Sequence, residues 1–128
     1  MEQKTIGRFE MTVTEADTAA HMGSGSLPVL ATPALVAMME HAACNALSDT
    51  LEPGLTTVGT RMEVSHDAAS PLGMRCWAEA TLTETNGRMY TFSIQAFDEA
   101  GPIGKATHQR ALVKSERFME KTNAKLQK

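Results

Sequence analysis

A run of fourteen residues without a helix breaker, Ala34–Leu47, constrains the fold more than any other feature of the sequence. Thr32 offers an N-cap hydroxyl just before this run, and Pro33 suits the first position of a helix. We therefore predict a helix over about residues 33–48, roughly 24 Å long. We expect this helix to be buried on nearly every side, because only three residues between Pro33 and Leu47 are polar: Glu40, His41 and Asn45.

The rest of the sequence contains five segments that alternate apolar and polar residues, as half-buried β-strands do. They are residues 6–14, 56–66, 74–84, 88–98 and 103–114. Asn86-Gly87 predicts a two-residue hairpin and residues 99–102 predict the next turn, so we expect the last four strands to form an antiparallel meander. The turn-rich stretch 21–28 predicts a loop or flap, and a short helix is expected after Ser115.

This order of elements predicts an α+β fold, in which a curved antiparallel sheet wraps round a central buried helix. The chain has 128 residues, of which 42% are hydrophobic, and this suits one domain over residues 1–128. One layer of sheet leaves two strand edges and a second face open. We therefore expect self-association into a homodimer or a dimer of dimers.

Charge and cysteine content exclude several classes of protein. Twelve Lys and Arg against fifteen Asp and Glu give a net charge of −3, which argues against a nucleic-acid partner. Cys44 and Cys76 form no CxxC pair, the N-terminal residues lack the apolar segment of a secretory signal, and no run of about 18 apolar residues predicts membrane insertion. The sequence thus favours a cytoplasmic protein without a membrane partner.

Glu40 is the most informative single residue. A carboxylate on a buried helix must be paired or protonated, because its desolvation costs on the order of several kcal/mol. In one interpretation Glu40 faces outward and pairs with a nearby cation. In the other it is a general base or a nucleophile.

The strand predicted over residues 56–66 ends at His66, which is expected to share a face with Val58, Thr60, Met62 and Val64. His66 is either a core histidine or one that polarises a substrate or transfers a proton. Gly59 would weaken the same strand unless a bulge or a close backbone approach needs it. A bare glycine amide is also suited to point at a developing oxyanion.

Thr32 and Arg110 each allow two interpretations. The Thr32 hydroxyl either caps the helix or faces a ligand, since a helix N-terminus favours negative charge. Arg110 is either a surface ion-pair partner or a binder of an anionic ligand. His41 and Cys44 have no second pair of ligands nearby in the sequence, and no glycine loop for phosphates is present, so we expect neither a metal nor a cofactor.

Two segments of the chain resemble the fluoroacetyl-CoA thioesterase-like group of hotdog-fold proteins. They are residues 31–43, Ala-Thr-Pro-Ala-Leu-Val-Ala-Met-Met-Glu-His-Ala-Ala, and residues 57–66, Thr-Val-Gly-Thr-Arg-Met-Glu-Val-Ser-His. The resemblance covers about residues 5–114. The group's catalytic threonine, glutamate and histidine match Thr32, Glu40 and His66, and its glycine and arginine match Gly59 and Arg110 in order and spacing.

The resemblance implies a hotdog dimer in which two sheets join and an acyl-CoA thioester binds at the subunit interface. Glu40 would activate water or attack the thioester carbonyl, and Thr32 would position Glu40 or the substrate. His66 and the Gly59 amide would stabilise the carbonyl oxygen as it gains charge. Arg110 would support the site or meet a CoA phosphate.

The family's fluoroacetyl-specific enzyme carries phenylalanines in its lid segment. This chain has Gly and Ser at residues 23–26 and no phenylalanine between Phe9 and Phe92, so the resemblance implies a short or small acyl group in general. Two other functions are compatible with the same scaffold. They are a non-catalytic protein that binds or senses acyl-CoA, and a dehydratase of hydroxyacyl thioesters.

Overall fold

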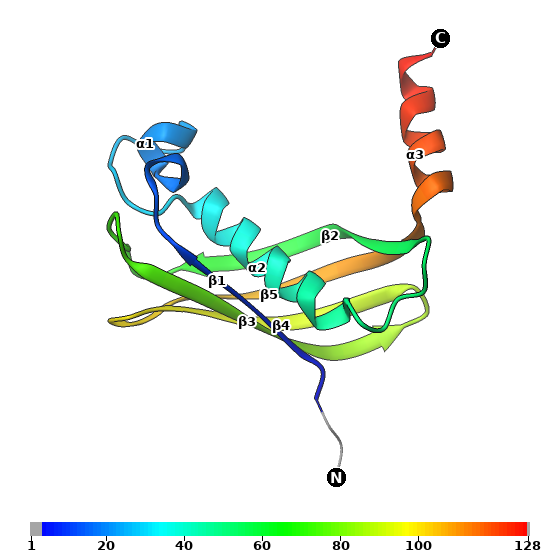
Figure 1. The fold of residues 1–128 in the computed structure, drawn as a ribbon, viewed down its shortest axis with the longest axis horizontal. Helices are drawn as coiled ribbons and strands as arrows, with labels where there is room; N and C mark the ends of the chain where they lie inside the picture. The colour runs from blue at the N-terminus through cyan, green and yellow to red at the C-terminus, as the bar shows by residue number, and fades with distance from the viewer. Residues whose placement is uncertain (1–3, 128) are drawn as a thin grey trace.

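The computed structural model describes residues 4–127, and five strands form one curved antiparallel sheet (Figure 1). The strands are β1 (Ile6–Thr12), β2 (Leu55–His66), β3 (Arg75–Asn86), β4 (Met89–Asp98) and β5 (Gly101–Lys114). The long helix α2 (Thr32–Leu47) lies across one face of the sheet and contacts β1, β2, β3 and β4. The predicted α+β architecture is confirmed, and each strand begins and ends within two residues of its prediction.

The order of strands in the sheet is β1-β3-β4-β5-β2, so the predicted meander is correct for β3, β4 and β5 but wrong for β2. Two-residue turns join the three strands of the meander, and Gly87 in the first turn has a positive φ of 64°. β2 pairs with β5 rather than with β3. The eight-residue connection 67–74 is too long for a tight hairpin and carries the chain from β2 to the opposite half of the sheet.

Short helical elements lie between β1 and α2 and after β5. Two elements precede α2, the 3₁₀ turn η1 (Glu15–Asp17) and the helix α1 (Ala19–Met22). Residues 23–28 are exposed and lack regular structure, which confirms most of the predicted loop. The predicted C-terminal helix is α3 (Ser115–Asn123), followed by the 3₁₀ turn η2 (Ala124–Leu126), and it projects away from the sheet in Figure 1.

The core lies between α2 and the sheet. Leu35, Met39 and Ala42 are fully buried there against Phe92 and Ile94 of β4. Gly7 lets β1 approach the helix closely, because a Cβ at this position would overlap the backbone of α2.

The prediction that α2 is buried on nearly every side is wrong. The sheet covers one side of the helix, and no other part of residues 4–127 covers the opposite side. An exposed or half-exposed stripe therefore runs along α2, formed by Thr32, Pro33, Val36, Ala37, Glu40, His41, Cys44 and Asn45. Among the described residues, no helix combines the length and the hydrophobicity that crossing a membrane requires.

Candidate functional site

Thr32 and His66 form the first of two polar clusters. The helix N-cap is Ala31 and Thr32 is already helical, so the prediction that Thr32 caps α2 is wrong. Its Oγ1 instead shares a hydrogen bond of 2.8 Å with Nδ1 of His66, the last residue of β2. Both residues line a cavity of about 250 Å³. Nε2 of His66 is buried and has no hydrogen-bond partner among the described residues.

Glu40 lies in the second cluster, and its environment differs from the predicted one. Its side chain is 40% exposed rather than buried, because it belongs to the uncovered stripe of α2. Oε2 accepts a hydrogen bond of 3.2 Å from Nη1 of Arg110. The interpretation of Glu40 as a partner of a nearby cation therefore describes its geometry, and this geometry leaves an acid/base role open.

Arg110 is buried, so the expected surface location is wrong although the ion pair is present. Thr57 on β2 holds the guanidinium at two points. Nε of Arg110 donates to Oγ1 of Thr57 at 2.8 Å, and Nη2 donates to the Thr57 carbonyl oxygen at 3.0 Å. These bonds orient the planar guanidinium so that Nη1 reaches the carboxylate of Glu40.

His108 is a member of this cluster that the sequence analysis missed. Its ring is 1% exposed, and Nδ1 donates to the carbonyl oxygen of Arg61 at 2.7 Å. Burial, reinforced by the Arg110 cation, lowers the pKa of His108 below its usual 6.5. The ring is therefore neutral at pH 7, and Nε2 accepts a hydrogen bond of 3.2 Å from Nη1 of Arg110.

The two-residue alternation of a strand could have identified His108 and Thr57 as candidate site residues. Residues two apart in a strand point to the same face. His108 is two positions before Arg110 on β5, and Thr57 is two positions before Gly59 on β2. Both therefore share a face with a residue that was already a candidate.

Gly59 lies beside Glu40, and the expectation of a bulge or a close approach is confirmed on both counts. The pairing of β2 with β5 shifts between Gly59 and Arg61. A Cβ at position 59 would lie 2.5 Å from Oε2 of Glu40. The absence of a side chain thus leaves the space that the carboxylate occupies.

The same bulge corrects a prediction about the faces of β2. An extra residue in a strand reverses its alternation beyond that point. Val58 and Thr60 therefore do not share the face of Met62, Val64 and His66, and the expectation of one common face is wrong for these two residues.

The two clusters are well separated within one chain. Thr32 and Glu40 are eight residues apart on α2, about 12 Å along the helix axis. Gly59 and His66 are seven residues apart on β2, roughly 20 Å along the strand. The five candidate residues thus form a Thr32–His66 pair and a Glu40–Gly59–Arg110 group, rather than one constellation.

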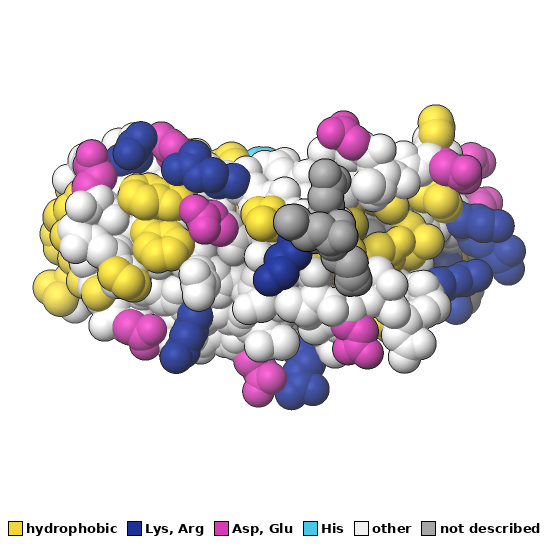
Figure 2. All heavy atoms as spheres, turned by 90° about the horizontal axis from the view of Figure 1, so that it is seen from below, with side chains coloured by type: hydrophobic (Ala, Val, Ile, Leu, Met, Phe, Trp, Pro, Cys, Tyr) yellow, Lys and Arg dark blue, Asp and Glu magenta, His cyan; other side chains and the backbone are white. Residues whose placement is uncertain are grey.

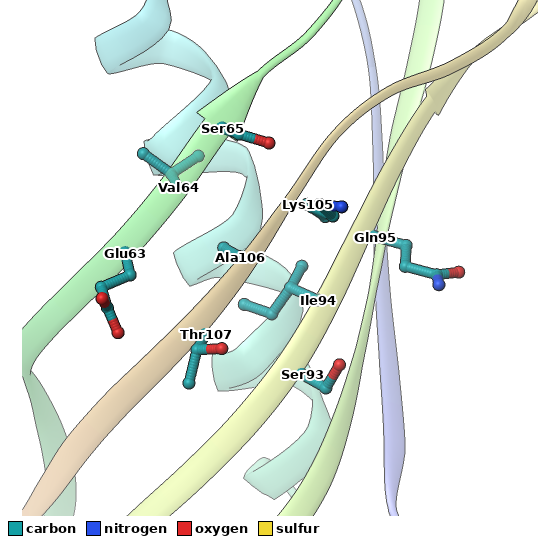
Figure 3. A pocket seen from close by; sticks show the side chains of 9 residues that line it. All are labelled: Glu63, Val64, Ser65, Ser93, Ile94, Gln95, Lys105, Ala106 and Thr107. Atoms are coloured by element: carbon teal, nitrogen blue, oxygen red, sulfur yellow. The ribbon is translucent and has the colours of Figure 1, made fainter.

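A larger cavity has no connection with these clusters. It is a shallow depression of about 390 Å³ on the face of the sheet opposite α2, where Figure 3 labels residues of β2, β4 and β5 around it. None of the five candidate residues lines it. Within residues 4–127, no group of three or more His, Cys, Asp or Glu side chains is placed to hold a metal ion.

Comparison with known proteins identifies relatives across nearly the whole chain. The sequence pattern of the fluoroacetyl-CoA-specific thioesterase family (FlK) matches residues 13–116. The fluoroacetyl-CoA thioesterase of Streptantibioticus cattleyicolor is 37% identical over 97 residues, which cover 76% of this chain and 70% of that protein.

Solved structures agree with this match. The fluoroacetyl-CoA thioesterase FlK superposes with a TM-score of 0.90 at 31% identity, covering 98% of this chain and 97% of that chain. A thioesterase superfamily protein from Thermus thermophilus superposes with a TM-score of 0.87 at 26% identity, covering 98% and 95% of the two chains. Variants of FlK have been solved with acetyl-CoA and with fluoroacetate and CoA.

Proposed function

The chain belongs to the fluoroacetyl-CoA-specific thioesterase family and is an acyl-CoA thioesterase, and we propose that its substrate carries a short or small acyl group. The observation that carries the hydrolytic function is the carboxylate of Glu40, which Arg110 holds in the space left by Gly59. The carboxylate is fixed on one side and half exposed on the other, as a group that meets a substrate must be.

Glu40 would supply the chemistry of hydrolysis. Arg110 bonds Oε2, whereas Oε1 has no hydrogen-bond partner among the described residues. Oε1 would either take a proton from a water molecule that attacks the thioester carbonyl or attack this carbon itself to form an anhydride. In both routes the C–S bond breaks, the CoA sulfur gains a proton, and water supplies the oxygen of the acid.

A second copy of the chain would unite the two clusters. β2 is an edge strand, and one stripe of α2 is uncovered, so each offers a surface to a second copy of the chain. Antiparallel pairing of two β2 edges centred near Met62 would set Gly59 opposite His66 of the partner subunit. A two-fold axis near Val36 would likewise bring Glu40 of one copy towards Thr32 of the partner subunit.

In this homodimer, each site would take Glu40, Gly59 and Arg110 from one subunit. The other subunit would supply the Thr32–His66 pair, whose hydrogen bond fixes the imidazole. Nε2 of His66, which has no partner within residues 4–127, and the Gly59 amide would then stabilise the oxygen of the thioester carbonyl. Two such homodimers could pair further, and the free cysteines Cys44 and Cys76 favour a cytoplasmic location.

The cavity beside the Thr32–His66 pair supports a small acyl group. Its volume is about 250 Å³, and the short side chains of Ala19, Ala68 and Ala69 form part of its lining. The FlK structures hold acetyl-CoA or fluoroacetate, both of which have a two-carbon acyl unit. We therefore expect acyl groups of a few carbons to react fastest.

Thiol release from a panel of acyl-CoA thioesters, followed with a disulfide-exchange dye, tests this function. Thermal stabilisation by each thioester is measured in parallel. Stabilisation without thiol release for every thioester would favour the binding or sensing protein. Formation of an enoyl thioester from a hydroxyacyl-CoA, without free thiol, would favour the dehydratase.

A further inference from the structure

Four cations converge on one pocket at the end of the molecule from which α3 projects. The pocket has a volume of about 330 Å³ and is lined by Arg88, Lys114, Arg117 and Lys121, together with Val113 and Phe118. These residues come from the turn before β4, the end of β5 and the helix α3. Figure 2 shows Lys and Arg side chains gathered at this end of the molecule.

Within residues 4–127, the four cations lack counter-charges. Among residues 4–127, none of their side chains forms an ion pair within 4.0 Å or a hydrogen bond with another side chain. Arg117 and Lys121 are one turn apart on the same face of α3, whereas Glu116 and Glu120 lie on a neighbouring stripe and do not line the pocket. Like charges around one concavity that are unpaired among the described residues, in a chain of net charge −3, indicate a site for an anion.

We propose that this pocket binds the phosphorylated nucleotide of CoA, an adenosine diphosphate with a third phosphate on its ribose. The inference rests on the proposed thioesterase function and adds a subsite to it. The cations suit the phosphates, which carry several negative charges. Phe118 is 37% exposed on the pocket wall and offers its ring to the adenine base.

The position of the pocket fits the length of CoA. Lys114 is four residues beyond Arg110 on β5, about 13 Å along the strand, and shares its face of the sheet. The pantetheine arm between the thioester and the pyrophosphate has about thirteen bonds, equivalent to roughly four residues of extended chain or ~15 Å. A thioester near Arg110 therefore leaves the nucleotide within reach of the pocket.

Two substrates that differ only in the nucleotide test the proposal. Acetyl-CoA and S-acetylpantetheine share the thioester and the arm, but only acetyl-CoA carries the phosphates. Lys121→Glu should lower kcat/KM for acetyl-CoA about tenfold and leave kcat/KM for S-acetylpantetheine unchanged. Lys105→Glu, the same charge reversal on the opposite face of the sheet, is the matched control and should change neither value.

Inhibition of hydrolysis, together with binding of adenosine 3′,5′-bisphosphate measured by isothermal titration calorimetry, provides the second readout. Adenosine 3′,5′-bisphosphate should inhibit hydrolysis of acetyl-CoA competitively, and Arg117→Glu/Lys121→Glu should weaken this inhibition more than Lys105→Glu does. Equal losses for both substrates, no loss for either, or the same inhibition by inorganic phosphate would overturn the proposal. If neither thioester is hydrolysed but the nucleotide still binds and the charge reversal weakens it, the proposed function fails while the nucleotide site stands.

Discussion

Oε2 of Glu40 lies 3.2 Å from Nη1 of Arg110, although the two residues are 70 positions apart in the sequence. The contact joins α2 to β5 across the space that Gly59 leaves open on β2. Three elements thus fix the position of one carboxylate. Thr57 and His108 fix it indirectly, because each forms a hydrogen bond with the guanidinium of Arg110.

Replacing Glu40 tests its chemical role. Glu40→Gln keeps the shape of the side chain but removes the base or nucleophile, so kcat for thioester hydrolysis should fall by about three orders of magnitude. The protein should stay folded, because the side chain is half exposed and an amide oxygen can still accept from Arg110. Thiol release and circular dichroism measure the two effects. Glu84→Gln, on an exposed part of β3, is the control, and full activity in Glu40→Gln would remove Glu40 from the mechanism.

A side chain at position 59 should displace the carboxylate. The Cβ of Gly59→Ala would lie 2.5 Å from Oε2 of Glu40, so the carboxylate must shift and its bond to Arg110 must lengthen. We expect kcat to fall by one to two orders of magnitude and the free energy of unfolding to fall by about 1–2 kcal/mol. Steady-state kinetics and urea unfolding measure these changes.

The control for Gly59→Ala is the same substitution in a Glu40→Ala background. The clash is absent there, so the loss of unfolding free energy should shrink or disappear. An unchanged loss would mean that the alanine perturbs the β-bulge itself rather than the carboxylate.

Local patterns predicted most of the fold. The breaker-free run Ala34–Leu47 gave α2 almost to the residue, and Asn86-Gly87 located the β3–β4 turn, because helix continuity and turn geometry depend on neighbouring residues. The placement of β2 beside β5 depends on contacts between distant segments. Nothing in the alternation of residues 56–66 identifies its partner strand.

The geometry of the candidate site likewise depends on contacts between distant segments, which local sequence patterns do not predict. The scarcity of polar residues between Pro33 and Leu47 predicted a buried helix around Glu40. Burial also depends on what covers the helix, and one side of α2 is uncovered within residues 4–127. The bulge at Gly59 reversed the faces of Val58 and Thr60, since a single extra residue changes the parity of a strand. His108 was missed because a buried histidine differs from a surface histidine only through its tertiary contacts.

Mixed dimers test whether the site is shared between subunits. Glu40→Gln and His66→Ala should each be inactive alone. If Glu40 and His66 act across the interface, a heterodimer of the two variants keeps one intact site, and random mixing should restore about a quarter of wild-type activity. Subunits are exchanged in mild denaturant, refolded and assayed for thiol release. No recovery in verified heterodimers would place both residues of a working site in the same subunit.

His108 should act as a positioning residue for Arg110 and, through it, for Glu40. His108→Leu removes the acceptor for Nη1 and should lower kcat about tenfold with little change in KM. His108→Gln retains an acceptor oxygen on a chain of similar reach and should keep most of the activity. If both variants lose the same activity, the imidazole has a role other than orienting the guanidinium.

The lowered pKa of His108 also predicts how stability depends on pH. Below pH 6.5 the unfolded state binds a proton at this histidine, whereas the folded state does not until the pH falls through the lower folded pKa. The free energy of unfolding should therefore decrease on acidification over this interval, by at most about 1.4 kcal/mol per pH unit from this group. Urea unfolding of wild type and His108→Gln at one protein concentration, between about pH 7.5 and 5, isolates this contribution because the other histidines are common to both. The variant should show the shallower decrease, and identical slopes would mean that the buried ring gains its proton in the folded protein as readily as in the unfolded chain.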